Sequence, residues 1–123
     1  MIPPLIVQEA LDRNIRLIAI TDHNATGNIK AVMEAAQGTD LTVLPGMELQ
    51  TREEVHLLCL FDRLEQAEEW QKVVDSFLPQ RSNNPEFFGE QFIVDASGDF
   101  IRREERLLIV SVDIGLDEAV SQV

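Results

Sequence analysis

The chemistry of this chain is predicted to centre on its two histidines, because each lies near a carboxylate at the end of an apolar run. His23 follows Asp22 immediately after the apolar run Arg16–Ile20. Glu48 follows a second apolar run and a Pro-Gly turn, and His56 opens a third. Zn²⁺, Mn²⁺ and Fe²⁺ all accept imidazole and carboxylate ligands, and the two oxygens of a glutamate can bridge two such ions. His23, Glu48 and His56 are therefore candidate metal ligands.

Each of these residues also has a plain structural interpretation. The following helix could be capped by Asp22, Asn24 or Thr26. His23 would then be a polar residue of the turn. Glu48 could be an exposed strand residue in a chain rich in glutamate, and His56 a polar residue that leads into a buried strand. Taken one at a time, these interpretations are favoured, because such short motifs are common in unrelated sequences.

The elements that must position these residues follow in the order helix, strand, helix, strand. Apolar residues at helical spacing predict a helix over Pro3–Leu11 and another from about Thr26 to Ala36. Short continuous apolar runs predict strands at Arg16–Ile20 and Leu41–Leu44. This alternation is typical of βαβ units and a parallel sheet, in which ligands bind at the carboxyl ends of the strands.

The pattern changes after the second strand, where a hairpin is expected instead of a helical crossover. Met47–Gln50 and Val55–Phe61 flank a polar tetrapeptide. A three-residue loop that starts at Thr51 would place Glu48 directly across from His56, whereas a four-residue loop would place them on opposite faces. A shared metal site at this hairpin therefore depends on the register.

The second half of the chain adds four predicted features that carry no obvious chemistry. They are a helix over Glu65–Leu78, a polar loop at residues 79–89, a short hairpin of Gln91–Asp95 with Phe100–Arg102, and an apolar block at residues 107–112. Residues 117–120 resemble the first turn of another helix. No repeat or linker interrupts the chain, so residues 1–123 are expected to form one domain.

The composition favours a soluble α/β domain and excludes several classes of partner. The chain has 123 residues, 45% of them apolar, with a formal charge of −12. That charge repels phosphate backbones and anionic lipid, which argues against stable nucleic-acid binding and against a membrane-surface protein. The longest apolar run, Leu57–Phe61, is far too short to span a bilayer. Cys59 is the only cysteine and lies within that run, so we expect a buried thiol and a cytoplasmic location.

Taken together, the segments that carry the candidate ligands resemble the motifs of a known family. Thr21-Asp22-His23 follows one strand, Pro45-Gly46-Met47-Glu48 follows the next, and His56 lies on the strand after that. In this order they resemble the second and third motifs of the PHP (polymerase and histidinol phosphatase) family of metal-dependent phosphoesterases. The later segments Phe87–Gln91 and Gly115–Val120 are similar to one branch of small, free-standing PHP proteins.

The resemblance implies both a fold and a reaction. The implied fold is a partial PHP-like (β/α)7 barrel with parallel strands plus a β-hairpin. His23, Glu48 and His56 would fall on metal-ligand positions for Zn, Mn or Fe, with Glu48 bridging two ions and Asp22 orienting a ligand histidine from the second shell. The implied reaction is the hydrolysis of a phosphorylated small molecule or nucleotide by metal-activated water.

The chain also departs from the family pattern. It contains no His-x-His motif, and the ligand motifs that the family carries nearer its C-terminus are absent, so we expect a PHP-like domain truncated at both ends and weak or inactive as a catalyst. Open sheet edges would favour pairing, and a homo-oligomer is therefore expected. Three accounts stay open: a fragment of a full enzyme, a short form that self-associates, or a remnant. The alternative function is a non-catalytic oligomeric assembly protein on the same scaffold.

Overall fold

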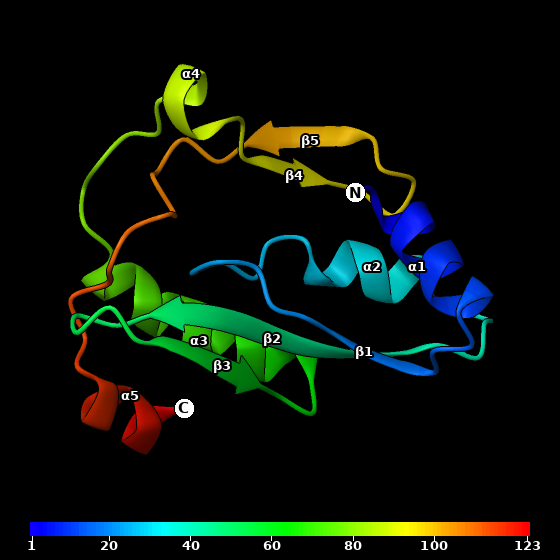
Figure 1. Cartoon of the computed structure of the whole chain (residues 1–123), viewed down its shortest axis with the longest axis horizontal. Helices are drawn as coiled ribbons and strands as arrows, with labels where there is room; N and C mark the ends of the chain where they lie inside the picture. The colour runs from blue at the N-terminus through cyan, green and yellow to red at the C-terminus, as the bar shows by residue number, and fades with distance from the viewer.

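The computed structural model describes residues 1–123, which form two small sheets and five helices (Figure 1). The first sheet contains β1 (Leu17–Ile20), β2 (Thr42–Gln50) and β3 (His56–Leu60), and the second contains β4 (Phe92–Val94) and β5 (Phe100–Arg103). The helices are α1 (Pro3–Asp12), α2 (Ile29–Ala35), α3 (Leu64–Phe77), α4 (Pro85–Phe88) and α5 (Leu116–Gln122). None of these helices has the length and apolar character needed to cross a membrane.

The three-stranded sheet has the order β1-β2-β3, with the longest strand in the centre. β1 and β2 are parallel, with Leu17 opposite Thr42, because the chain crosses over through α2 between them. β2 and β3 are antiparallel, because the tight turn over residues 51–55 is too short for a crossover. The predicted hairpin at this position is thus present in the structure.

The predicted (β/α)7 barrel is wrong. The sheet contains one parallel pair, and its strands β1 and β3 are both open edges, whereas a barrel pairs every strand on both sides. After β3 the chain leaves the sheet and enters α3, and the apolar block at residues 107–112 forms no strand. Leu107 and Val112 are buried nevertheless, so this block adds to the core as an irregular segment and does not close the sheet.

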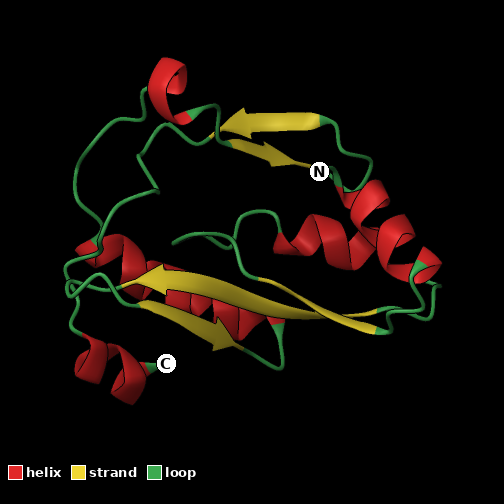
Figure 2. Ribbon diagram, viewed as in Figure 1, coloured by secondary structure: helices red, strands yellow, loops and turns green.

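One face of the sheet is covered by helices, which divide the core into two clusters. α1 and α2 pack over the first half of β2, around Val7, Val32 and Val43. α3 packs over the second half of β2 and over β3, and Figure 2 shows it behind these strands. Its buried residues Trp70 and Val74 contact the sheet through the spacing that the sequence predicts for this helix.

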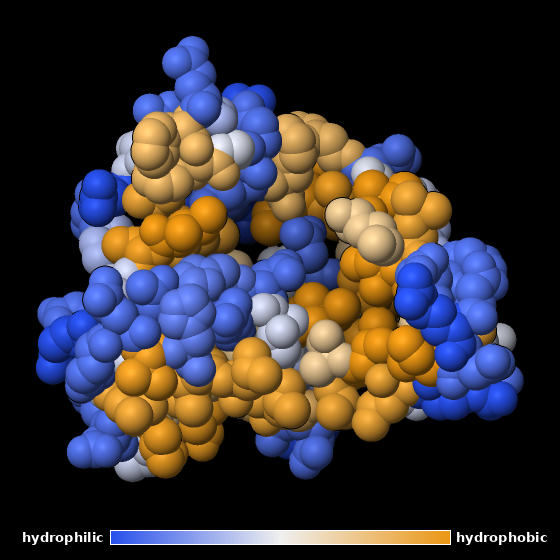
Figure 3. Space-filling view, viewed as in Figure 1, coloured by the Kyte–Doolittle hydropathy of each residue, from blue (hydrophilic) through white to orange (hydrophobic).

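The opposite face of the sheet carries no helix and exposes leucine side chains. Leu17, Leu58 and Leu60 are 57%, 60% and 53% exposed. Their cross-strand partners on β2 are even-numbered residues, and since side chains alternate along a strand, all three leucines point to this one face. Figure 3 shows a broad apolar surface in the lower half of the view, where Figure 1 places this sheet and α5. We call Leu17, Leu58 and Leu60 the open face.

The β4–β5 hairpin forms a second layer, and hydrogen bonds of the Asn28 side-chain amide hold it against the first layer. The sequence predicts this hairpin, and the structure contains it, with Gly98 at a positive φ of 87° in its turn. The Asn28 side chain donates a hydrogen bond to the carbonyl of Phe92 and accepts one from the N–H of Val94. The hairpin is thereby fixed close to the loop that carries His23.

Candidate metal centre

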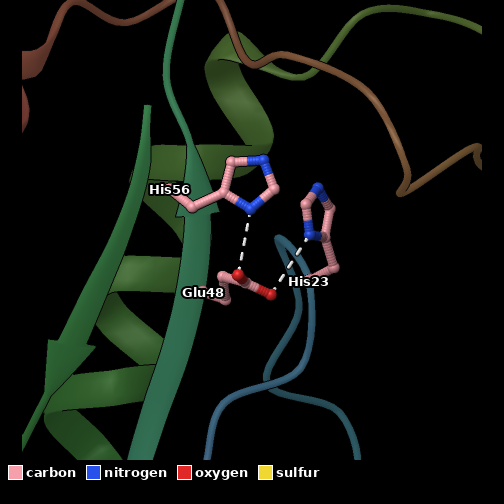
Figure 4. A group of neighbouring side chains, drawn as sticks. All are labelled: His23, Glu48 and His56. Carbon is pink, nitrogen blue, oxygen red and sulfur yellow. Dashed lines mark hydrogen bonds and ion pairs between the residues drawn. The ribbon is translucent and has the colours of Figure 1, made fainter. Parts of the chain in front are cut away.

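Three predicted ligands meet at one place in the structure. One ligand atom from each of His23, Glu48 and His56 lies within 4.8 Å of the other two (Figure 4). The rings of His23 and His56 are 5.3 Å apart between centroids and inclined by 66°. The three side chains therefore converge in the structure, and binding of an ion remains a prediction.

Backbone hydrogen bonds hold the His23 loop against β2. The N–H of Asn24 donates to the carbonyl of Glu48 at 2.9 Å, and the N–H of Glu48 donates to the carbonyl of Asp22 at 3.1 Å. These two bonds form an isolated parallel bridge between His23 and Glu48 beyond the end of β1. The loop therefore continues the parallel pairing of β1 with β2, which brings the His23 side chain beside the carboxylate.

Glu48 and His56 are neighbours through the β2–β3 hairpin, in a register that differs from both registers that the sequence left open. Glu48 is paired with Leu58, and His56 is paired with Gln50. Five residues, 51–55, connect the paired residues Gln50 and His56, and within this connection the N–H of Thr51 donates to the carbonyl of Val55. The resulting shift of two residues preserves the face, so His56 lies diagonally across from Glu48 and its Nδ1 is 3.0 Å from Glu48 Oε1.

Electrostatics keep Glu48 in the form that binds cations. The hydrogen bond with His56 lowers the pKa of the Glu48 carboxyl below its ordinary value. Partial burial opposes that shift. Glu48 is consequently a carboxylate at neutral pH, placed between two imidazoles.

Gln50 is a residue of this site that sequence reasoning misses. Its Oε1 is 2.8 Å from His23 Nε2, on the side of the ring away from Glu48. Ligand histidines in metalloproteins are commonly oriented in this way by an oxygen acceptor on the second nitrogen. The alternation of β2, which puts residues 48 and 50 on one face with His56, is the one sequence signal that points to Gln50.

Asp22, expected to orient a ligand histidine, makes no side-chain hydrogen bond to either histidine in the structure. Its side chain lines a hollow of about 270 Å³ next to His23. Apolar side chains form much of that hollow, and they include Phe88, Phe92, Ile93, Leu108 and Ile109. The orienting role of Asp22 therefore stays a prediction, and Gln50 makes the contact that such a role requires.

The helix-capping interpretation of the His23 loop is not what the structure contains. Asn28 precedes α2, and no side chain caps that helix. Asn24 is fully buried, and its side chain donates to the carbonyls of Leu108 and Val110 and accepts from the N–H of Gln50. The polar residues of this loop thus fasten it to β2 and to the irregular segment 107–112.

Comparisons of this chain with known proteins give no match to a family model, to a curated protein or to a solved structure. The resemblance to the PHP family consequently stays a prediction, and the function has to be argued from the site itself.

Proposed function

We propose that His23, Glu48 and His56 bind a divalent metal ion, Zn²⁺, Mn²⁺ or Fe²⁺, which activates water to hydrolyse a phosphate ester. The observation that carries the proposal is the convergence, within 4.8 Å, of two imidazoles and one carboxylate from three separate segments. Clusters of acidic residues are common on surfaces without an ion, but a carboxylate that contacts two imidazoles is the donor set of transition-metal sites. A free thiol at Cys59 fits the cytoplasm as the compartment.

The number of ligands supports a catalytic site over a structural one. Structural zinc sites have four protein ligands, whereas catalytic sites have three and leave a position for water. Here three residues converge, and the His56 side chain is 50% exposed, so solvent reaches the site. A bound ion would lower the pKa of its water to about 7, which makes hydroxide available at neutral pH.

The ion would also supply the positive charge that a phosphate ester needs. The chain carries a formal charge of −12, and no lysine or arginine lines the hollow beside His23. Arg103 and Arg106 are bound instead to Glu90 and Glu104, the two glutamates of that hollow. The positive charge that binds a phosphorylated small molecule or nucleotide would therefore come from the metal ion, which would reverse the negative local field of the chain.

Turnover by this ligand set is expected to be slow. In-line phosphoryl transfer is fastest with two metal ions that stabilise both the attacking and the leaving oxygen. His23, Glu48 and His56 provide four side-chain donor positions at most, counting both oxygens of Glu48, which is too few for two closed ion sites. The proposal is accordingly metal binding with weak hydrolysis.

The experiment is elemental analysis of protein purified without chelator, combined with Mn²⁺-stimulated cleavage of bis(p-nitrophenyl) phosphate. Wild type is expected to retain close to one ion per chain, and Glu48→Ala to lose both the ion and the cleavage. Glu68→Ala is the matched control, because Glu68 is an exposed glutamate on α3, away from the cluster. Equal metal content in wild type and Glu48→Ala would refute the proposal.

The open face favours a second candidate function, a non-catalytic assembly protein that forms homo-oligomers. Leu17, Leu58 and Leu60 each expose more than half of their side chains on one sheet face, and the open edges of β1 and β3 can pair with another chain. Sedimentation velocity over a concentration series is the test. Leu58→Lys should dissociate the oligomer, and Leu5→Lys, on exposed α1, should not. A wild-type monomer at every concentration would exclude this candidate.

A further inference from the structure

Both ring nitrogens of His23 are engaged, but by different partners. Nδ1 lies 3.5 Å from Glu48 Oε2, and Nε2 lies 2.8 Å from Gln50 Oε1. Only 20% of the His23 side chain is exposed, so the ring has little freedom to turn away from either contact. The arrangement in Figure 4 shows one nitrogen of this ring turned toward Glu48.

Gln50 is itself fixed by hydrogen bonds of its backbone and of its side-chain amide. Its backbone N–H donates to Asn24 Oδ1 at 2.9 Å, and its carbonyl accepts from the N–H of Val112 at 2.8 Å. Its side-chain Nε2 donates to Ser111 Oγ at 3.1 Å. With the amide nitrogen directed at Ser111, the amide oxygen is left to face His23.

An amide oxygen can only accept a hydrogen bond, so Nε2 of His23 must carry the hydrogen of the 2.8 Å contact. Neutral imidazole carries one such hydrogen, and Nδ1 therefore presents a lone pair to the Glu48 carboxylate. Two acceptors that face each other at 3.5 Å repel unless a proton or a metal cation lies between them. When the ring of His23 is neutral, a metal cation at this point would remove the repulsion.

We propose that Gln50 is a positioning residue that holds His23 in the Nε2–H tautomer and thereby makes Nδ1 its metal-binding atom. The inference rests on the proposed metal centre, which it deepens by naming the ligand atom and the residue that selects it. His56 offers a contrast within the same site. Its Nδ1 contacts Glu48, its Nε2 has no hydrogen-bond partner, and its side chain is 50% exposed.

The experiment reads the tautomer of His23 directly, by long-range ¹H–¹⁵N correlation of the imidazole rings in metal-free protein. At about pH 8, wild type is expected to show the Nε2–H form. Gln50→Leu removes the acceptor and should give a mixture of tautomers, with Zn²⁺ affinity lowered about 10- to 100-fold. Gln50→Glu retains an oxygen acceptor and should restore both the tautomer and the affinity.

Gln71→Leu is the matched control, because Gln71 is also a part-buried glutamine that bonds the His23 loop, through Thr26 and the carbonyl of Asn24. It should lower stability and leave the tautomer and the Zn²⁺ affinity unchanged. An Nδ1–H form in wild type, or the same tautomer in wild type and Gln50→Leu, would overturn the inference. The tautomer of His23 could change in Gln50→Leu while wild type binds no Zn²⁺. That result would uphold the role of Gln50 in selecting the tautomer and would refute the proposed metal centre.

Discussion

Glu48 and His56 lie diagonally across the β2–β3 hairpin, with Glu48 Oε1 3.0 Å from His56 Nδ1, although the residue paired with Glu48 is Leu58. The second oxygen of the same carboxylate faces His23, which comes from the loop after β1. Glu48 thus joins the parallel and the antiparallel halves of the sheet at the site. Loss of the Glu48 charge should therefore weaken metal binding much more than it lowers the stability of the fold.

The first prediction separates these two effects with Glu48→Gln, which preserves the shape of the side chain. Zn²⁺ affinity measured by calorimetric titration should fall by more than the roughly 10- to 100-fold expected for a residue that only supports a ligand. The free energy of unfolding in urea should change by no more than about 1 kcal/mol, because Glu48 and His56 are 33% and 50% exposed and such ion pairs are screened by water. A large loss of stability would make Glu48 a structural residue.

Much of the fold could be predicted from local pattern. The apolar stripe of α3 predicts the helix to within one residue at each end, and the short apolar runs predict β1 and the first part of β2 with the parallel pairing between them. The turn expected at Pro45-Gly46 is wrong, because β2 continues through these residues to Gln50. The hairpin β2–β3 follows from two apolar runs around a polar turn. In each case the residues that decide the structure are close together in the sequence.

The parts that could not be predicted depend on contacts between distant residues. The side chain of Asn24 bonds carbonyls 84 and 86 residues away, and no local pattern shows that these partners lie together. The register of β2–β3 depends on how Thr51 and Val55 close the turn. The barrel failed as a prediction because the apolar block at residues 107–112 has a strand-like composition, yet its backbone bonds to Asn24 and Gln50.

The second prediction concerns Asn24, the buried residue that joins the site to that irregular segment. Its side chain makes three hydrogen bonds, and its φ of 52° lies in the left-handed region. Asn24→Ala should lower the free energy of unfolding by about 3 kcal/mol, since each bond contributes about 1 kcal/mol and its partners would be left buried. Urea denaturation followed by circular dichroism gives this value.

A glycine replacement distinguishes the hydrogen bonds of Asn24 from its backbone conformation. Asn24→Gly removes the bonds but adopts a positive φ freely, so it should still be destabilised, and by less than Asn24→Ala. Asn14 is the control, because it also has a positive φ, of 58°, but is exposed at the end of α1 and has no side-chain hydrogen bond. Asn14→Gly should leave stability close to that of wild type. Wild-type stability in Asn24→Gly would show that the three bonds contribute nothing.

The third prediction is that the only thiol of the protein is inert while the chain is folded. Cys59 is 2% exposed, and burial raises its pKa from 9.0 to about 11, against a smaller opposing effect of Trp70. Because the thiolate is the reactive form, this rise alone slows reaction with Ellman's reagent about 100-fold at pH 8. Labelling should therefore be slow in buffer and rapid in concentrated urea. Equal rates in the two conditions would place Cys59 at the surface.

The fourth prediction concerns stability in acid and rests on Glu104, which is 7% exposed. Burial alone would raise the pKa of this carboxyl, but hydrogen bonds from Arg106 and Arg102 outweigh it and lower the pKa below its ordinary 4.5. A carboxyl with a lowered pKa in the folded state contributes stability above its unfolded pKa, and this stability is lost as the pH falls through the folded value. Glu104 should therefore stabilise the protein at neutral pH and cease to do so in acid.

The comparison of Glu104→Gln with wild type isolates this contribution from that of the other carboxylates. At pH 7 the variant should be less stable by about 2 kcal/mol, because a neutral amide replaces the carboxylate that accepts hydrogen bonds from the charged Arg106. The difference should shrink steadily below about pH 4.5, since protonated glutamate and glutamine then carry the same charge. Glu9→Gln, in an exposed ion pair with Arg13, should show almost no difference at either pH. Urea midpoints measured for the three proteins from about pH 7 to about pH 3 test this, and a constant gap between wild type and Glu104→Gln would contradict the assignment.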